Sequence, residues 1–109
     1  MKRMVPAALA ALIVLGLSGQ AGAQDMGDPK KGAELAQMVC AECHAVGNTR
    51  NPSPNAQAPS FASVATAPGM TPTALRVWFQ TPHPTMPNLL LTNDAKDNLI
   101  AYILSLKRP

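Results

Sequence analysis

The chain has 109 residues, of which 47% are hydrophobic, 14% charged and 4% aromatic, and its formal net charge is +3. This length permits one small domain and excludes a multidomain enzyme. Two cysteines are too few for the dense disulfide framework of a small secreted scaffold. The charge is too mild, and the lysines and arginines too scattered, for a nucleic-acid-binding protein.

The N-terminal segment has the composition of a secretory signal peptide. A Lys-Arg pair at residues 2–3 precedes the almost entirely apolar stretch 5–17, and Ala-Gly-Ala at residues 21–23 has the small-x-small pattern that signal peptidase reads. We therefore expect residues 1–23 to be removed, leaving one domain at residues 24–109. An uncleaved anchor is the alternative, but the apolar run of 13 residues is short against the roughly 20 that span a bilayer.

The chain that remains is poor in large apolar side chains. It keeps 7 basic and 6 acidic residues, a formal charge of +1, and its aromatic residues are Phe61, Trp78, Phe79 and Tyr102. A chain of this size lies near the margin for burying its own core. We therefore expect a cofactor, a metal or a partner subunit to supply apolar bulk.

The first half of the domain predicts one helix, a loop and a short helical segment. Asp28 can cap a helix that begins at Pro29 and continues to Cys40, with Gly32, Ala36 and Val39 on one face. Residues 47–58 are polar and interrupted by prolines, which is typical of a loop. Residues 59–65 can form one or two helical turns with Phe61 and Val64 facing inward.

The second half predicts two helices separated by a stiff segment. Thr71 and Pro72 open a helix to about Gln80, with Leu75, Trp78 and Phe79 as its buried stripe. Three prolines within residues 81–88 forbid a regular helix there. Thr92 caps the last helix, whose apolar face consists of Ala95, Leu99, Tyr102, Ile103 and Leu106. No segment alternates with a period of two, so the predicted fold class is all-α.

The sequence Cys40-Ala41-Glu42-Cys43-His44 is the C-x-x-C-H pattern of c-type haem attachment. Two thiols three residues apart on one helical face can add to the vinyl groups of one porphyrin, and the tether then places the His44 imidazole under the iron at high effective concentration. A thioredoxin-like motif would need a β-α-β setting, and a zinc site usually needs four protein ligands. A simple disulfide would leave His44 and the missing core bulk unexplained.

The second axial ligand has several candidates in the chain: Met26, Met38, Met70, Met86 and His83. Met38 precedes Cys40 on the same helix and cannot reach the opposite haem face. Met86 lies in the stiff segment 42 residues after His44, where a rigid loop can hold a flexible thioether at a fixed distance from iron. We expect Met86 to be the ligand. Ordinary packing of Met86, or ligation by His83 with a lower potential, is the alternative.

Together these segments resemble the class I cytochromes c, specifically the small bacterial type with one haem. The resemblance covers essentially the whole mature chain: D-P-K-K-G-A-E-L-A before C-A-E-C-H, then A-P-S-F, P-H-P-T-M-P-N-L-x-L-T and N-L-I-A-Y-I-L-S-L-K. It implies three to four helices around one covalently bound haem c, with the first and last helices crossing. It also implies that Gly32 and Ala36 meet Leu99 and Tyr102 at that crossing.

The resemblance further implies a role for each site residue. Cys40 and Cys43 look like the thioether residues, and His44 and Met86 like the proximal and distal iron ligands. Pro59 resembles the proline whose carbonyl receives the Nδ1–H of His44. Phe61 and Trp78 are expected in the haem pocket, Trp78 with a possible contact to a propionate and with plain packing as the alternative. Leu75, Phe79, Leu89, Leu99 and Ile103 are expected to line the same pocket.

The expected function is that of a periplasmic electron carrier rather than an enzyme. The iron would cycle between Fe(III) and Fe(II) while a monomeric protein docks briefly on a redox donor and a redox acceptor, with no nucleic acid and no stable membrane insertion. Two alternatives are a haem gas sensor with a displaceable distal ligand and a cytochrome subunit docked permanently on a dehydrogenase or oxidase. No paired carboxylates, Ser-His-Asp set or phosphate loop points to a catalytic site of its own.

Overall fold

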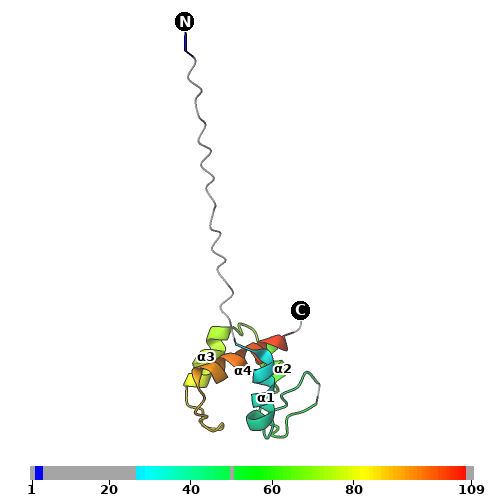
Figure 1. Ribbon diagram of the computed structural model, residues 1–109. Coiled ribbons are helices and arrows are strands. Elements are labelled where there is room, and N and C mark those ends of the chain that lie inside the picture. Colours follow the sequence, from blue (N-terminus) through cyan, green and yellow to red (C-terminus); the bar gives the residue numbers. More distant parts are fainter. Residues whose placement is uncertain (1, 4–26, 50, 108–109) are drawn as a thin grey trace.

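The computed structural model describes residues 2–3, 27–49 and 51–107, and Figure 1 shows their arrangement. Apart from Lys2 and Arg3, the predicted signal peptide lies outside the described residues, as do Met26, Arg50 and Arg108. The helical elements are α1 (Pro29–Leu35), η1 (Ala36–Cys40), α2 (Phe61–Thr66), α3 (Pro72–Gln80) and α4 (Asn93–Ser105). The described ranges contain no strand, and the predicted all-α class is confirmed. None of the helices in these ranges is long and apolar enough to cross a membrane.

The helices begin where capping side chains allow them to begin. A side-chain oxygen of Asp28 accepts the amide of Lys30 at 2.8 Å, and Thr71 and Thr92 cap α3 and α4 in the same way. These three starts were predicted. The Ser60 hydroxyl, which accepts the amide of Ser63 at 3.1 Å, is a fourth cap that the prediction lacked. Each cap satisfies an amide that the first helical turn leaves without a partner.

Helix α1 packs across α4 at very close range (Figure 1). A Cβ atom added to Gly32 would overlap the carbonyl oxygen of Asn98 and would lie 2.7 Å from the Cβ of Tyr102. The amide of Asp28 also donates to the side-chain oxygen of Asn98 at 2.8 Å. Glycine at position 32 therefore permits the predicted crossing of the first and last helices, with Ala36 fully buried beside it.

The core is built around α4, which α1, α2 and α3 all contact. The fully buried residues Leu99, Ile100 and Ile103 are its largest side chains without solvent contact. Ile100 was absent from the predicted apolar face, because the prediction assumed that α4 packs against the rest of the protein along one side. Neighbours on several sides widen the buried arc of α4 beyond a single stripe.

The end of the first helix departs from α geometry. In η1 the amide of Ala41 donates to the carbonyl of Ala36 at 2.9 Å, a bond between residues five apart, as in a π-turn. The wider turn rotates Val39 outward, where it is 38% exposed, and leaves Cys40 7% exposed. The prediction that Val39 shares one face with Gly32 and Ala36, both of which are buried, was therefore wrong.

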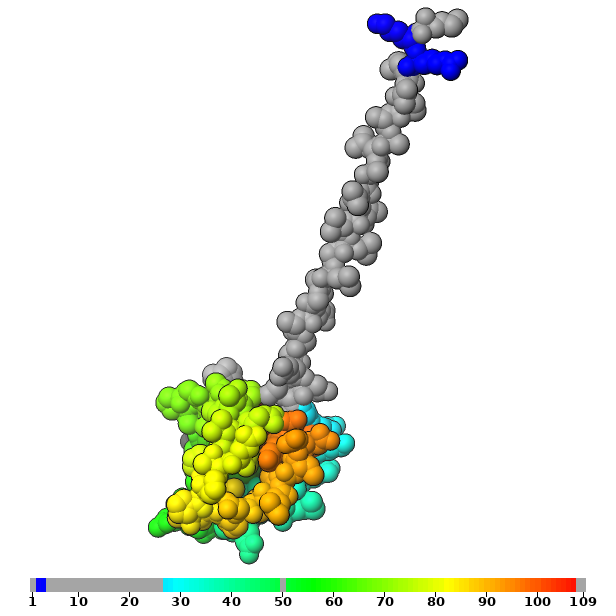
Figure 2. All heavy atoms as spheres, turned by 90° about the vertical axis from the view of Figure 1, so that its left-hand side faces the viewer, coloured from blue at the N-terminus to red at the C-terminus, as the bar shows by residue number. Residues whose placement is uncertain are grey.

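Helix α3 lies beside the first turns of α4 on one face of the molecule. Figure 2 shows the two segments, in yellow and orange, next to each other, and an ion pair between Arg76 and Asp97 joins them. Leu75 is buried at 2% exposure and Phe79 packs partly buried against the core, but Trp78 is 54% exposed. The predicted burial of Trp78 within this stripe is not found, because Trp78 lies toward the segment of residues 79–91 rather than in the core.

Candidate functional site

The two cysteines lie on either side of a helix end. Cys40 is the last residue of η1 and is buried, whereas Cys43 lies in the following turn and is exposed. Both thiols are free, and the amides of Cys43 and His44 donate to the carbonyl of Cys40 at 3.1 and 2.9 Å. The expectation that both thiols share one helical face is corrected: a turn carries the second one. Burial raises the pKa of the Cys40 thiol, which favours its neutral form.

His44 is held by the backbone of a distant residue. Its Nδ1 donates to the carbonyl oxygen of Pro59 at 2.6 Å. A proton on Nδ1 leaves the lone pair of Nε2 available in the neutral imidazole. The hydrogen bond implied by the sequence resemblance is therefore present, and it fixes which nitrogen of His44 can bind a metal.

The segment around His44 is fastened to α2 and α4. The ring of Phe61 lies 5.4 Å from that of His44, and the Phe61 amide donates to the carbonyl of Ala45 at 2.9 Å. From α4, the hydroxyl of Tyr102 donates to the carbonyl of Val46 at 2.5 Å. These contacts, made by residues far apart in the sequence, hold the two residues that follow His44.

The polar loop after His44 folds back onto the same turn. The amide of Asn55 donates to the carbonyl of Cys43 at 3.1 Å, and the amide of Ala45 donates to the hydroxyl of Ser53 at 3.0 Å. Neither bond could be read from a proline-interrupted polar sequence. Together they tie the loop to the C-x-x-C-H turn without covering Cys43.

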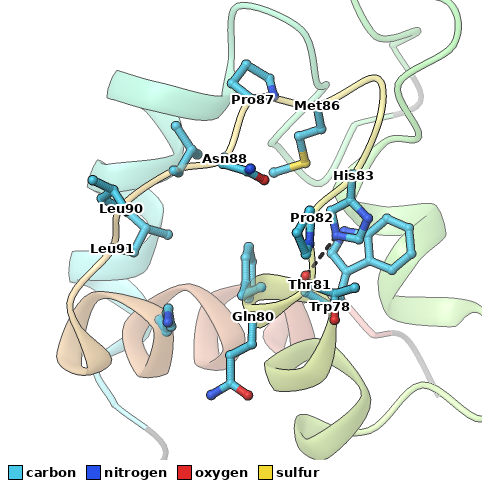
Figure 3. A pocket seen from close by; sticks show the side chains of 13 residues that line it. Trp78, Gln80, Thr81, Pro82, His83, Met86, Pro87, Asn88, Leu90 and Leu91 are labelled. Atoms are coloured by element: carbon cyan, nitrogen blue, oxygen red, sulfur yellow. Dashed lines mark hydrogen bonds between the residues drawn. The ribbon is translucent and has the colours of Figure 1, made fainter.

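A second group of predicted site residues lies around the segment between α3 and α4. Met86 and Trp78 line a cavity of about 360 Å³, and Figure 3 shows the Met86 side chain pointing into it. Much of the remaining lining is apolar and includes Phe79, Leu89 and Leu91, while Lys96 is its charged residue. Leu75, Leu99 and Ile103, which were also expected to line the haem pocket, are buried in the core and do not line this cavity.

His83 contacts this second group in a way that the sequence did not predict. Its ring is stacked on Trp78 with centroids 3.7 Å apart and an interplanar angle of 19°. Its Nε2 donates to the carbonyl oxygen of Trp78 at 2.8 Å. The bond places the proton of the neutral His83 ring on Nε2, so His83 is joined to the end of α3.

The predicted site residues thus form two groups. Cys40, Cys43, His44, Pro59 and Phe61 gather around the end of η1 and the start of α2, while Met86 and Trp78 line the cavity beside α3. The lining of that cavity includes none of the first group. Of the other methionines, Met38 is 77% exposed on η1 and Met70 packs partly buried against the core.

The donor set fits a haem better than it fits a bare metal ion. Two free thiols beside an imidazole with an available Nε2 match covalent attachment and axial ligation, and a thioether can supply the opposite ligand. Within the described ranges, no three His, Cys, Asp or Glu side chains gather to hold an ion.

This arrangement defines a protein with covalently attached haem. Residues 29–107 match the family model described as Cytochrome c, and the chain belongs to the cytochrome c family as a class I cytochrome with one haem. It is 36% identical over 95 residues to cytochrome c-552 of Bradyrhizobium diazoefficiens, across 87% of this chain and 90% of that relative. No solved structure matches the chain. As a family member it carries haem c with its iron and acts in haem-based electron transfer.

Proposed function

We propose that this protein is a periplasmic electron carrier in which His44 and Met86 are the axial ligands of the haem iron. Cys40 and Cys43 form the thioether bonds, and Pro59, Phe61 and Trp78 line the haem pocket. The observation that carries the proposal is the 2.6 Å hydrogen bond from His44 Nδ1 to the Pro59 carbonyl. It presents Nε2 as the metal-binding nitrogen beside two free thiols.

The Pro59 carbonyl has two effects on His44. It fixes the orientation of the ring, and it raises the basicity of Nε2 by accepting the proton of the other nitrogen. Phe61 limits rotation of the same ring from one side, since it is itself 6% exposed and cannot move away. The imidazole is therefore set in place by the protein before any metal binds.

Met86 suits the opposite position because its loop is stiff and its side chain is flexible. Pro84 and Pro87 restrict the backbone on both sides of Met86, while a thioether with three rotatable bonds adapts to a required distance. The haem, once bound, supplies a one-electron couple whose potential is higher with His/Met than with bis-His ligation. Phe79, Leu89 and Leu91 exclude water from the side of Met86, which favours the less charged state.

Export to the periplasm is supported by the pattern of the first 23 residues. We propose that the mature protein begins at Gln24 and works as a monomer that docks briefly on a donor and an acceptor, without catalysing a reaction of its own. N-terminal sequencing of the protein from a periplasmic fraction should give Gln24 as the first residue. A cytoplasmic protein that retains Met1 would contradict the proposed location.

The ligand assignment is tested by spectra of the purified holoprotein and two variants. Met86→Ala should remove the charge-transfer band of the methionine–iron bond and lower the reduction potential. Met38→Ala is the matched control, because Met38 is 77% exposed. This variant should leave both the charge-transfer band and the reduction potential unchanged. An unchanged band in Met86→Ala would overturn the assignment.

A further inference from the structure

We propose that His83 positions Met86, by bracing the loop of residues 81–88 against the end of α3. The inference rests on the proposed ligation of iron by Met86. It assigns His83 a role that is distinct from ligation and from general packing.

The loop has few other attachments to the fold. Among residues 82–88, all within the described ranges, His83 alone makes a hydrogen bond or a ring contact. Thr81, one residue earlier, donates its amide to the carbonyl of Trp78 at 3.2 Å and its hydroxyl to that of Val77 at 2.7 Å. Beyond His83, the next bond along the chain, between Leu91 and Leu89, is local. His83 is therefore the last point at which the loop is fastened to α3 before Met86.

The attachment at His83 combines two interactions with one residue. The imidazole is stacked on the Trp78 indole at 3.7 Å, and its Nε2 donates to the Trp78 carbonyl at 2.8 Å. That carbonyl is one of the last four of α3, which have no partner within the helix. The same carbonyl also accepts the Thr81 amide, so the His83 bond is a second bond to this helix end, and it joins the loop to α3, as Figure 3 shows.

Proline residues carry this constraint from His83 to Met86. Pro84 follows His83, and Pro87 follows Met86, so the α-helical conformation is disfavoured at both His83 and Met86. Pro84 has a fixed φ of its own, which leaves Thr85 as the one residue between them without a proline restriction. Movement of His83 should therefore displace Met86 rather than be absorbed along the loop.

Loss of the brace should make Met86 leave the iron more often. The change removes one neutral hydrogen bond and one ring stack, and the stack is the weaker kind because Trp78 is half exposed. Together they correspond to roughly a tenfold change in the population of the detached state.

The test uses oxidised holoprotein and imidazole as the incoming ligand. Imidazole can bind iron only after the methionine leaves, so its binding rate reports detachment. His83→Ala should speed binding roughly tenfold, and His83→Phe, which keeps a ring for stacking but has no donor, should give an intermediate rate. Thr85→Ala is the matched control in the same loop and should stay within about twofold of the unaltered protein.

A second control separates positioning from general stability. Asp28→Ala removes the cap of α1 and should lower the midpoint of thermal unfolding, yet it should leave the imidazole rate unchanged. Two results would overturn the proposal: a His83→Ala rate within twofold of the original, or equal acceleration by Thr85→Ala or Asp28→Ala.

If Met86 were not a ligand of the iron, the variants would behave differently. In that case Met86→Ala would keep the charge-transfer band and bind imidazole at the original rate. If His83 were itself the ligand, His83→Ala, and not Met86→Ala, would lose the six-coordinate spectrum. Either result would also overturn the bracing role.

Discussion

The rings of Phe61 and His44 lie 5.4 Å apart at an angle of 50°, so the first side chain of α2 packs against the imidazole. Phe61 also packs 6.4 Å from the ring of Tyr102 on α4 and is 6% exposed. One aromatic side chain therefore joins the proposed iron ligand to the central helix. Its removal should affect both stability and the setting of His44.

Phe61→Ala should lower the unfolding free energy of the holoprotein by about 3–5 kcal/mol, because it leaves a cavity in the core. Phe61→Leu should cost less, since it fills most of that volume. Urea unfolding followed by haem absorbance measures both. A loss below about 1 kcal/mol for Phe61→Ala would mean that Phe61 does not support this side of the site.

Gly32→Ala should be strongly destabilising, because the added Cβ would overlap the carbonyl oxygen of Asn98 and lie 2.6 Å from its carbon. Separating α1 from α4 to make room should cost about 3 kcal/mol, at the upper end for an overpacked core. Gly47→Ala is the matched control, since its added Cβ would meet no atom closer than the Thr49 hydroxyl at 4.0 Å. Thermal unfolding of the two holoproteins should separate them clearly. Equal midpoints would contradict the close helix crossing.

Tyr102→Phe should cost about 1–2 kcal/mol, because it leaves the carbonyl of Val46 without its 2.5 Å partner. The ring remains in place against Phe61, so the change isolates the hydroxyl. Denaturant unfolding at neutral pH measures the loss. A variant as stable as the original protein would show that the hydroxyl does not hold the segment after His44.

The same residue gives the protein a stability that depends on pH. Burial raises the pKa of Tyr102 above the value of about 10 that it has in an unfolded chain. The folded state therefore keeps the phenol proton more tightly. The stability that the protonated Tyr102 contributes to the folded state is complete below about pH 10, and it is lost as the pH rises through the pKa of the folded state.

Urea midpoints measured between pH 8 and 11 should accordingly fall more steeply for the original protein than for Tyr102→Phe. The two curves should converge at the alkaline end. Parallel curves across this range would show that Tyr102 does not carry the dependence.

The sequence was most informative where local chemistry decides structure. Asp28, Thr71 and Thr92 marked the starts of three helices, because a cap and the first turn it serves lie within a few residues. The C-x-x-C-H pattern, with the family resemblance around it, led to haem c in the same way. Glycine at position 32 also indicated a close crossing, since small residues permit close approach.

The predictions failed where contacts with residues distant in the sequence determine the local structure. The π-turn that rotates Val39 outward depends on how η1 meets the rest of the fold, and no residue type in Ala36–Cys40 specifies it. Burial of Ile100 depends on α4 having neighbours on several sides. The stacking of His83 on Trp78 joins a loop to a helix end five residues away, and histidine in a proline-rich segment gives no signal for it.

Potentiometric titration of the mature holoprotein, followed by reduced-minus-oxidised spectra, tests His44/Met86 ligation of the haem iron. One haem should titrate as a single one-electron couple, with about 59 mV per tenfold change in the ratio of oxidised to reduced protein. The reduction potential should fall when Met86 is replaced by alanine and should be unchanged when Met38 is replaced by alanine. A low potential that Met86→Ala leaves unaltered would contradict His44/Met86 ligation.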